Sequence, residues 1–210
     1  MKFQVIDPKG KILEGPYIIR LPGWTEERYY QEAPRDQKAE FVKGELILMS
    51  PMSGEHSQTV YFLSSLIGGF CEVKKLGKIL PSPTIRLAPD VNREPDLCFI
   101  PQEKLHLATG MPIQAIPPFI IEVSWTTRSI DLGEKAQDYE RAQVGEYWVV
   151  DIEQKEVVVH LLEEGKYQRK TLKSGKLESR EIQGFYIHID WLWQKPLPSA
   201  LECLRELVDF

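Results

Sequence analysis

The sequence predicts an α/β fold in which a mixed β-sheet lies between helices. Two near-continuous apolar runs, Asp96 to Ile100 and Phe119 to Val123, are typical of central strands that are covered on both faces. A helical stripe of apolar residues precedes these runs, and a helix, another buried strand and a hairpin follow them. This order of elements favours a sheet enclosed by helices.

The length and composition suit one compact domain. The chain has 210 residues, of which 42% are hydrophobic and 27% charged, and this balance argues against disorder. We divide the chain into an N-terminal arm (1–38), a core (39–163) and a C-terminal extension of the same domain (164–210) that carries a hairpin and a short helix. The arm is polar and rich in proline, with a short helix expected around Thr25 to Glu32.

Charge and cysteine content limit the possible classes of protein. The net charge of −5 weakly opposes binding to a broad face of duplex DNA, although a local basic patch would still permit it. The odd number of cysteines, none close to another, argues against a disulfide framework and a cysteine zinc site, and indicates reduced thiols in a cytoplasmic protein. The first ten residues do not resemble a signal peptide, and no apolar run approaches the ~20 residues of a membrane span.

The first half of the core is expected to contain a strand, a helix and a second strand. Glu45 to Met49 predicts a strand that ends at Ser50-Pro51, and Thr84 to Ala88 predicts a weaker one. Between them, Ser53 is a suitable N-cap for a helix. The apolar stripe of that helix consists of Val60, Leu63, Ile67 and Phe70.

The second half continues the alternation of helix and strand. Asp131 to Gln143 predicts a helix, and Tyr147 to Val150 predicts another buried strand. A short C-terminal helix is expected after Ser199, which begins a capping-box pattern. Between that buried strand and the C-terminal helix we expect an antiparallel hairpin. It is formed by Glu156 to Leu162 and Tyr167 to Thr171, with its turn at Glu164-Gly165.

Two carboxylates lie where burial makes them costly. Asp96 opens one apolar strand directly after Pro95, and Glu122 lies near the end of the other. A carboxylate between two covered faces loses its hydration, so it must be paired, protonated or bound to a metal. If the two strands are neighbours, both carboxylates reach the same edge of the sheet.

A lysine on the following helix is the third candidate. Lys135 lies at the margin of the expected buried face, where its stem can cover apolar surface and its ammonium can reach the sheet edge. Glu134, Asp138 and Arg141 are expected to point away from that face. The buried face itself is expected to comprise Leu132, Ala136, Tyr139 and Gln143.

Two carboxylates and a lysine meet the needs of phosphodiester hydrolysis. The carboxylates can hold Mg²⁺, which polarises a phosphoryl oxygen and lowers the pKa of a bound water, and the lysine can position that water. A purely structural reading stays open: Glu122 and Lys135 can form a salt bridge with no further role, and Asp96 can simply end its strand.

Several of these residues resemble a known family. The pattern consists of Pro95-Asp96, Glu122-Val123, a helix with Lys135 and Tyr139, and the block from Gly145 to Asp151, which is its most specific part. It is similar to the Uma-type endonucleases of the PD-(D/E)XK, or restriction-endonuclease-like, superfamily, over roughly residues 39–163. The resemblance implies a four-stranded mixed sheet with flanking helices, a Mg²⁺-dependent nuclease (Mn²⁺ as a substitute), a nucleic-acid substrate such as DNA, and a homodimer.

The resemblance also implies a set of site residues. Asp96, Glu122 and Val123 match the metal positions, and Lys135 matches the catalytic lysine that this branch takes from the helix. The superfamily more often has that lysine two residues after the glutamate, where this chain has Ser124. Two further candidate catalytic residues, Glu40 and His56, match family positions near the site.

Other features leave alternatives open. His56, at the start of its helix, can bind phosphate or support a metal, or can be a capped structural histidine. Ser124 and the acidic balance favour a second hypothesis, a catalytically degenerate module that binds nucleic acid or protein. A third is an unrelated hydrolase with a carboxylate pair, such as a glycosidase, which would not need Lys135.

A basic segment from Gly165 to Arg180 is either a nucleic-acid footprint or a solvated hairpin surface. Four tryptophans are candidates for contacts between subunits or for core packing. They are Trp24, Trp125, Trp191 and Trp193.

Overall fold

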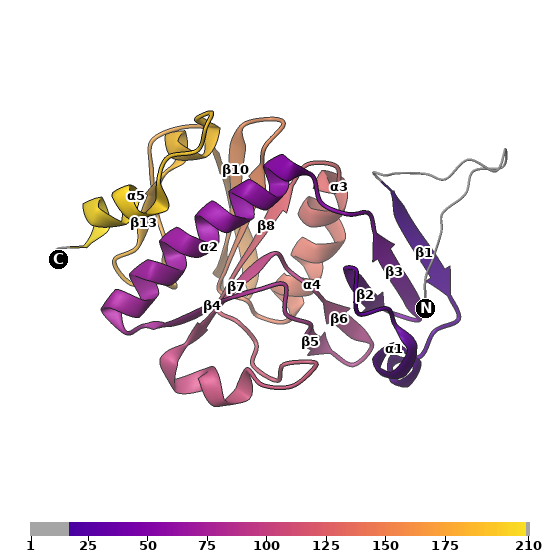
Figure 1. Ribbon diagram of the computed structural model, residues 1–210. Coiled ribbons are helices and arrows are strands. Elements are labelled where there is room, and N and C mark those ends of the chain that lie inside the picture. The colour runs from indigo at the N-terminus through magenta and orange to yellow at the C-terminus, as the bar shows by residue number, and fades with distance from the viewer. Residues whose placement is uncertain (1–16, 209–210) are drawn as a thin grey trace, which may run out of the picture.

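Two large β-sheets, a small two-stranded sheet and the helices that cover them form the part of the chain described by the computed structural model, residues 17–208 (Figure 1). Within that range the larger sheet has six strands in the order β11-β10-β9-β8-β7-β4. Only β8 and β9 run parallel, and the other neighbours are antiparallel. The strands are β4 (Gly77–Pro81), β7 (Leu97–Pro101), β8 (Phe119–Ser124), β9 (Glu146–Asp151), β10 (Glu156–Glu163) and β11 (Lys166–Leu172).

The predicted α/β class with a mixed sheet between helices is confirmed. Helix α2 (Gly54–Lys74), capped by Ser53 as expected, covers one face of the larger sheet, and Tyr139 and Ala136 of helix α4 pack on the other. All residues of β8 and β9 are buried, which explains their continuous apolar runs. The sheet is wider than the four strands that the family resemblance implied, because the hairpin β10–β11 extends one edge.

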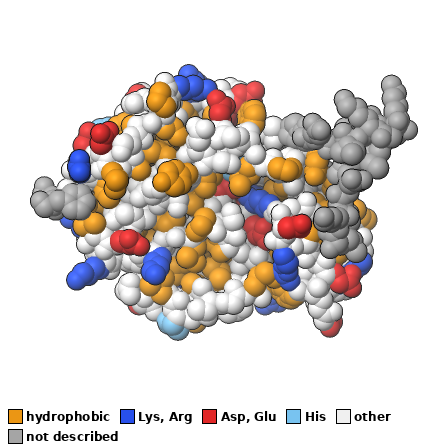
Figure 2. All heavy atoms as spheres, viewed as in Figure 1, with side chains coloured by type: hydrophobic (Ala, Val, Ile, Leu, Met, Phe, Trp, Pro, Cys, Tyr) orange, Lys and Arg blue, Asp and Glu red, His pale blue; other side chains and the backbone are white. Residues whose placement is uncertain are grey.

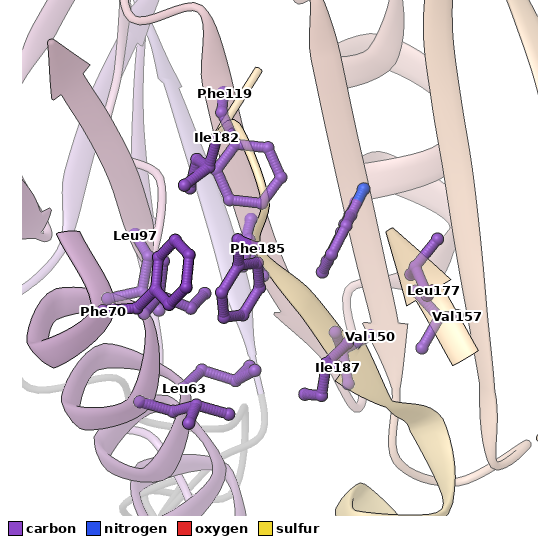
Figure 3. Close-up of a cluster of buried hydrophobic side chains, with 14 of the residues drawn as sticks. Leu63, Phe70, Leu97, Phe119, Val150, Val157, Leu177, Ile182, Phe185 and Ile187 are labelled. Carbon is purple, nitrogen blue, oxygen red and sulfur yellow. The ribbon is translucent and has the colours of Figure 1, made fainter. Parts of the chain in front are cut away.

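Apolar side chains from α2 and the C-terminal segment fill the space over one face of the sheet (Figure 3). Phe70 of α2 meets Phe185 edge to face, with their ring centroids 5.4 Å apart. Helix α5 (Ala200–Leu207), which Ser199 caps as predicted, packs beside α2. Between the hairpin and α5 lie β12 (Lys176–Glu178), β13 (Tyr186–His188) and the short 3₁₀ helix η3 (Ile189–Trp193).

A second sheet was largely missed by the sequence analysis. Within the described residues it has five antiparallel strands in the order β1-β3-β2-β6-β5. Helix α1 (Glu26–Glu32), which is the helix expected in this region, covers it. The ring of Tyr29 on α1 stacks on the ring of Phe41 on β2. Only two strands of this sheet were predicted, because the others are short and partly polar and lack a strong apolar pattern. The strands are β1 (Ile18–Pro22), β2 (Ala39–Val42), β3 (Glu45–Met49), β5 (Ile85–Ala88) and β6 (Val91–Arg93).

The helix expected from Asp131 to Gln143 is irregular. It begins earlier, as α3 (Arg128–Ile130), continues through a π-helical turn η2 (Asp131–Lys135), and ends as α4 (Ala136–Arg141). A π-turn places an additional residue in the helix and so rotates the faces on either side of it. As a result Asp131, Lys135 and Asp138 are all buried, and the expectation that Asp138 points away from the protein interior is wrong.

The division into arm, core and extension stays a prediction, although β1 and α1 of the arm belong to the second sheet and its cover. All three cysteines are buried and unpaired. A 3₁₀ helix, η1 (Gln102–Leu107), follows β7. Among residues 17–208, every helix is too short or too polar to pass through a lipid bilayer.

Gly77 tests the packing at the edge of the larger sheet. Its φ is +151°, and a Cβ there would collide with the backbone carbonyl of Ile100 on β7. We expect Gly77→Ala to lower the free energy of unfolding by about 1–3 kcal/mol, measured by urea denaturation. Gly54→Ala is the matched control, because a Cβ at Gly54 meets open space. Equal stability of the two variants would contradict this packing.

Candidate active site

Asp96 and Glu122 meet because of the register between β7 and β8. Leu97 pairs with Ile121 in an antiparallel ladder, so Asp96, one residue before β7, lies beside Glu122. Residues directly across an antiparallel pair point to the same face of the sheet. Both carboxylates therefore lie on the face that α4 covers, and both side chains are about 2–3% exposed.

A lysine that the sequence analysis did not select bridges the two carboxylates. The Lys38 Nζ lies 2.9 Å from Asp96 Oδ1 and 3.3 Å from Glu122 Oε2. Lys38 directly precedes β2, on the second sheet. Both acids are thus turned toward a single cation.

Lys135 reaches Glu122 from the opposite direction. Its ammonium lies 2.7 Å from Glu122 Oε1, and the Tyr139 hydroxyl donates to the same oxygen at 2.9 Å. The side chain of Lys135 is 1% exposed and lies at the end of the π-helical turn. Tyr139, which the sequence analysis assigned to the core, is both a core residue and a hydrogen-bond donor to Glu122.

Glu40 belongs to an ion network that joins the two sheets. Its Oε1 lies 3.2 Å from the Lys135 ammonium, and its Oε2 accepts a hydrogen bond of 2.8 Å from Arg93 on β6. Arg93 also binds Asp138 of α4 at 2.6 Å. The network fixes the second sheet against the helix that carries Lys135, and every one of these side chains is buried.

The remaining candidates hold the other oxygen of Asp96. The His56 Nε2 lies 3.1 Å from Asp96 Oδ2, and the Val123 backbone amide donates to the same oxygen at 2.8 Å. His56 lies in the first turn of α2, where its own amide donates to the Ser53 hydroxyl. The structure thus brings together all six sequence-predicted site residues: Glu40, His56, Asp96, Glu122, Val123 and Lys135.

Burial and neighbouring charges shift the pKa of each acid differently. Burial raises the pKa of Asp96, but Lys38 and His56 outweigh this effect and hold it below its usual range. The pKa of Glu40 falls to about 2, because Lys135 and Arg93 outweigh its burial. For Glu122, burial together with the charge of Asp96 prevails over the two lysines and raises the pKa to about 7.

Both lysines stay charged in this setting. Burial alone would lower the pKa of each ammonium. For Lys38 the charges of Asp96 and Glu122 outweigh burial and hold the pKa well above its usual value. For Lys135 the charges of Glu122 and Glu40 do the same.

The carboxylates line a cavity of about 410 Å³ that opens between α2 and the second sheet. Figure 2 shows acidic and basic side chains close together on the face between these two parts of the molecule. Trp125 lines this cavity with 43% of its surface exposed, whereas Trp24 belongs to the core. Trp191 and Trp193 pack against the core from its margin.

Asp96 and Glu122 fit a hard divalent cation. They present oxygen atoms, the ligands that Mg²⁺ prefers, and both already turn toward one cation, the Lys38 ammonium. Mg²⁺ commonly uses one or two carboxylates and keeps several waters. In the described part of the chain, no three side chains of His, Cys, Asp or Glu form a metal-binding group.

Lys38, Arg93 and Asp131 are the site residues that the sequence analysis missed. Asp131 lies 3.6 Å from Lys135 and accepts a hydrogen bond from Thr127. Glu40 could have pointed to Lys38, because residues two apart in an extended segment share a face, but the strand that holds Glu40 was not predicted. Arg93 lay in a strand that was not predicted.

The basic segment from Gly165 to Arg180 is partly neutralised. Lys166 pairs with Glu140, and Arg180 pairs with Glu163, at 2.9 and 2.8 Å. Lys176 similarly pairs with Glu178. These contacts favour the solvated hairpin surface over a nucleic-acid footprint.

Comparisons with known proteins identify the family of the chain and a structure of similar fold. Residues 26–189 match the model of a family described as Uma2, "putative restriction endonuclease". A solved structure described as "a putative nuclease belonging to DUF820", from Anabaena variabilis, is similar in fold with a TM-score of 0.67. It is 12% identical in sequence, and the match covers 81% of this chain and 97% of that one. No curated protein matches the chain.

The raised pKa of Glu122 predicts a pH dependence of stability. With a pKa of about 7 in the folded state against about 4.5 unfolded, the folded protein binds the proton more tightly. The metal-free protein should therefore lose unfolding free energy, relative to Glu122→Gln, as the pH rises from about 4.5 to about 7. Urea denaturation across this range measures the difference.

Glu153→Gln, at an exposed position, is the control for the loss of one carboxylate. If the difference in unfolding free energy between the native protein and Glu122→Gln stayed constant with pH, it would contradict the raised pKa of Glu122.

Proposed function

The chain belongs to the Uma2 family, whose description is "putative restriction endonuclease", and from this premise we propose that it hydrolyses phosphodiester bonds of nucleic acid with a divalent cation held by Asp96 and Glu122. One observation carries the proposal: two buried carboxylates from adjacent strands converge beside a cavity, with the Lys135 ammonium 2.7 Å from one of them. A structural salt bridge alone requires one acid and one base, and gives no reason for a second buried carboxylate facing the same cation.

Each residue has a proposed role. Asp96 and Glu122 hold the ion, which we propose to be Mg²⁺ with Mn²⁺ as a substitute, and Val123 orients Asp96 through its amide. When bound, the ion polarises a phosphoryl oxygen and lowers the pKa of a coordinated water. Lys135 positions the attacking water and offsets the negative charge that develops on the phosphate.

The surrounding residues fix these groups in place. Tyr139 donates to Glu122, and His56 lies against Asp96, so neither carboxylate can rotate freely. Glu40 lies between Lys135 and Arg93 and sets the position of the Lys135 ammonium. We therefore propose Glu40 and His56 as positioning residues.

Ser124 occupies the position where the superfamily more often has its lysine, and this favours the alternative of a catalytically degenerate binding module. Its side chain is buried and has no hydrogen-bond partner among the described residues. Lys135 reaches Glu122 from the helix instead, which supports retained chemistry. The same contact argues against a glycosidase, which would have no use for this lysine.

We propose DNA as the first substrate class to test. We also propose that the protein acts in the cytoplasm and forms a homodimer, which would bring two active sites to the two strands of a DNA duplex. The family supports nucleic acid as the substrate. The all-buried, unpaired cysteines are compatible with a reducing compartment.

Substitution of the site residues tests the proposed function. We expect Asp96→Asn, Glu122→Gln and Lys135→Met each to lower the cleavage rate by about 10²-fold or more, because the first two each remove a ligand of the ion and the third removes the cation beside the reacting phosphate. Cleavage is measured on supercoiled plasmid, single-stranded DNA and RNA, with Mg²⁺, Mn²⁺ or EDTA. Glu103→Gln, at an exposed position, should cleave at the unchanged rate.

Circular dichroism and gel filtration establish that the variants remain folded and report the oligomeric state. Undiminished cleavage by Asp96→Asn or Glu122→Gln would end the proposal. Binding of nucleic acid without cleavage under any metal condition would favour the degenerate module instead.

A further inference from the structure

We propose that Lys38 is an internal counter-cation, whose ammonium holds the divalent-ion position between Asp96 and Glu122 and leaves it when the ion binds. The inference rests on the proposed function, since it takes these two carboxylates as the ligands of the ion. It adds a competition between a protein side chain and the ion for the same oxygen atoms.

The four carboxylate oxygens divide into two groups. Asp96 Oδ2 faces His56 and the Val123 amide, and Glu122 Oε1 faces Lys135 and Tyr139. Only Asp96 Oδ1 and Glu122 Oε2 remain, and both face the Lys38 ammonium.

Asp96 Oδ1 and Glu122 Oε2, the oxygens that Lys38 contacts, are therefore the ones that would hold the ion. Mg²⁺ binds oxygen at about 2.0–2.1 Å and takes octahedral geometry. An ammonium 2.9 and 3.3 Å from the same two oxygens occupies the space that such an ion and its waters would need. Lys38 and the ion thus exclude one another.

Lys38 is placed so that it can leave, whereas Lys135 is not. The Lys38 side chain is 17% exposed and lies just outside a strand, while Lys135 is 1% exposed on a helix and is held by Glu40 and Asp131. Lys38 borders the cavity of about 410 Å³ and also a neighbouring cavity of about 750 Å³. The displaced ammonium can therefore move into solvated space without opening the core.

Charge explains why the chain has a lysine here. Without a cation, the two buried carboxylates would repel one another in a site of low dielectric constant. The ammonium neutralises them in the absence of the ion, and an incoming divalent ion replaces it with a larger charge. The metal-free fold is stabilised at the cost of a lower affinity for the ion.

Mn²⁺ binding to Lys38→Met tests the competition. We expect this variant to bind Mn²⁺ about tenfold more tightly than the native protein, measured by electron paramagnetic resonance of free Mn²⁺ and by calorimetry. In EDTA its Tm should be lower, and saturating Mn²⁺ should raise its Tm by more than it raises that of the native protein. Lys78→Met removes an exposed lysine and should leave the affinity unchanged.

Equal or weaker Mn²⁺ binding by Lys38→Met would overturn the inference. If that variant does not fold, Lys38→Arg keeps the charge and adds donors for the carboxylates, so it should bind Mn²⁺ more weakly than the native protein. Equal or tighter binding by Lys38→Arg would likewise overturn it.

Asp96→Asn separates this inference from the proposed function. If Mn²⁺ binding is lost in Asp96→Asn but is the same in Lys38→Met and the native protein, only the competition fails. If Asp96→Asn and the native protein bind Mn²⁺ equally, the proposed ion site fails as well.

Discussion

The approach of two carboxylates inside a covered sheet is the constraint on which the rest of the site depends. The register of β7 and β8 places Asp96 beside Glu122, where neither retains its hydration. Such a pair persists only with cations beside it, and the chain supplies Lys38 from one direction and Lys135 from the other. Burial raises the pKa of Glu122 even so, while Asp96 remains ionised.

The second sheet contributes to the site because the carboxylate pair needs positive charge beside it. Lys38 lies directly before a strand of this sheet, and Glu40 and Arg93 of the same sheet hold the helix that carries Lys135 in place. Breaking such a network leaves a buried charge uncompensated, which costs about 3–5 kcal/mol for each lost partner. The two sheets are therefore coupled through the site itself, and the geometry of the carboxylate pair depends on residues from both.

The sequence predicted the strands of the larger sheet except β4, because their long apolar runs give strong local signals. Capping residues such as Ser53 and Ser199 likewise marked where the covering helices begin. The sequence also predicted Asp96, Glu122 and Lys135 as a group, since charged residues in apolar elements are conspicuous. It missed the short strand that carries Arg93 and the π-turn that buries Asp138, because tertiary contacts decide both. Lys38 was missed because a lysine next to a short strand is typical of a solvated surface.

Crystals grown without metal and then soaked in Mn²⁺ provide the most direct test of the site. Anomalous scattering should place an ion within bonding distance of Asp96 Oδ1 and Glu122 Oε2, with the Lys38 side chain turned away from both. A Lys38 ammonium that still bridges the carboxylates in the soaked crystal, with no anomalous peak between them, would contradict the account.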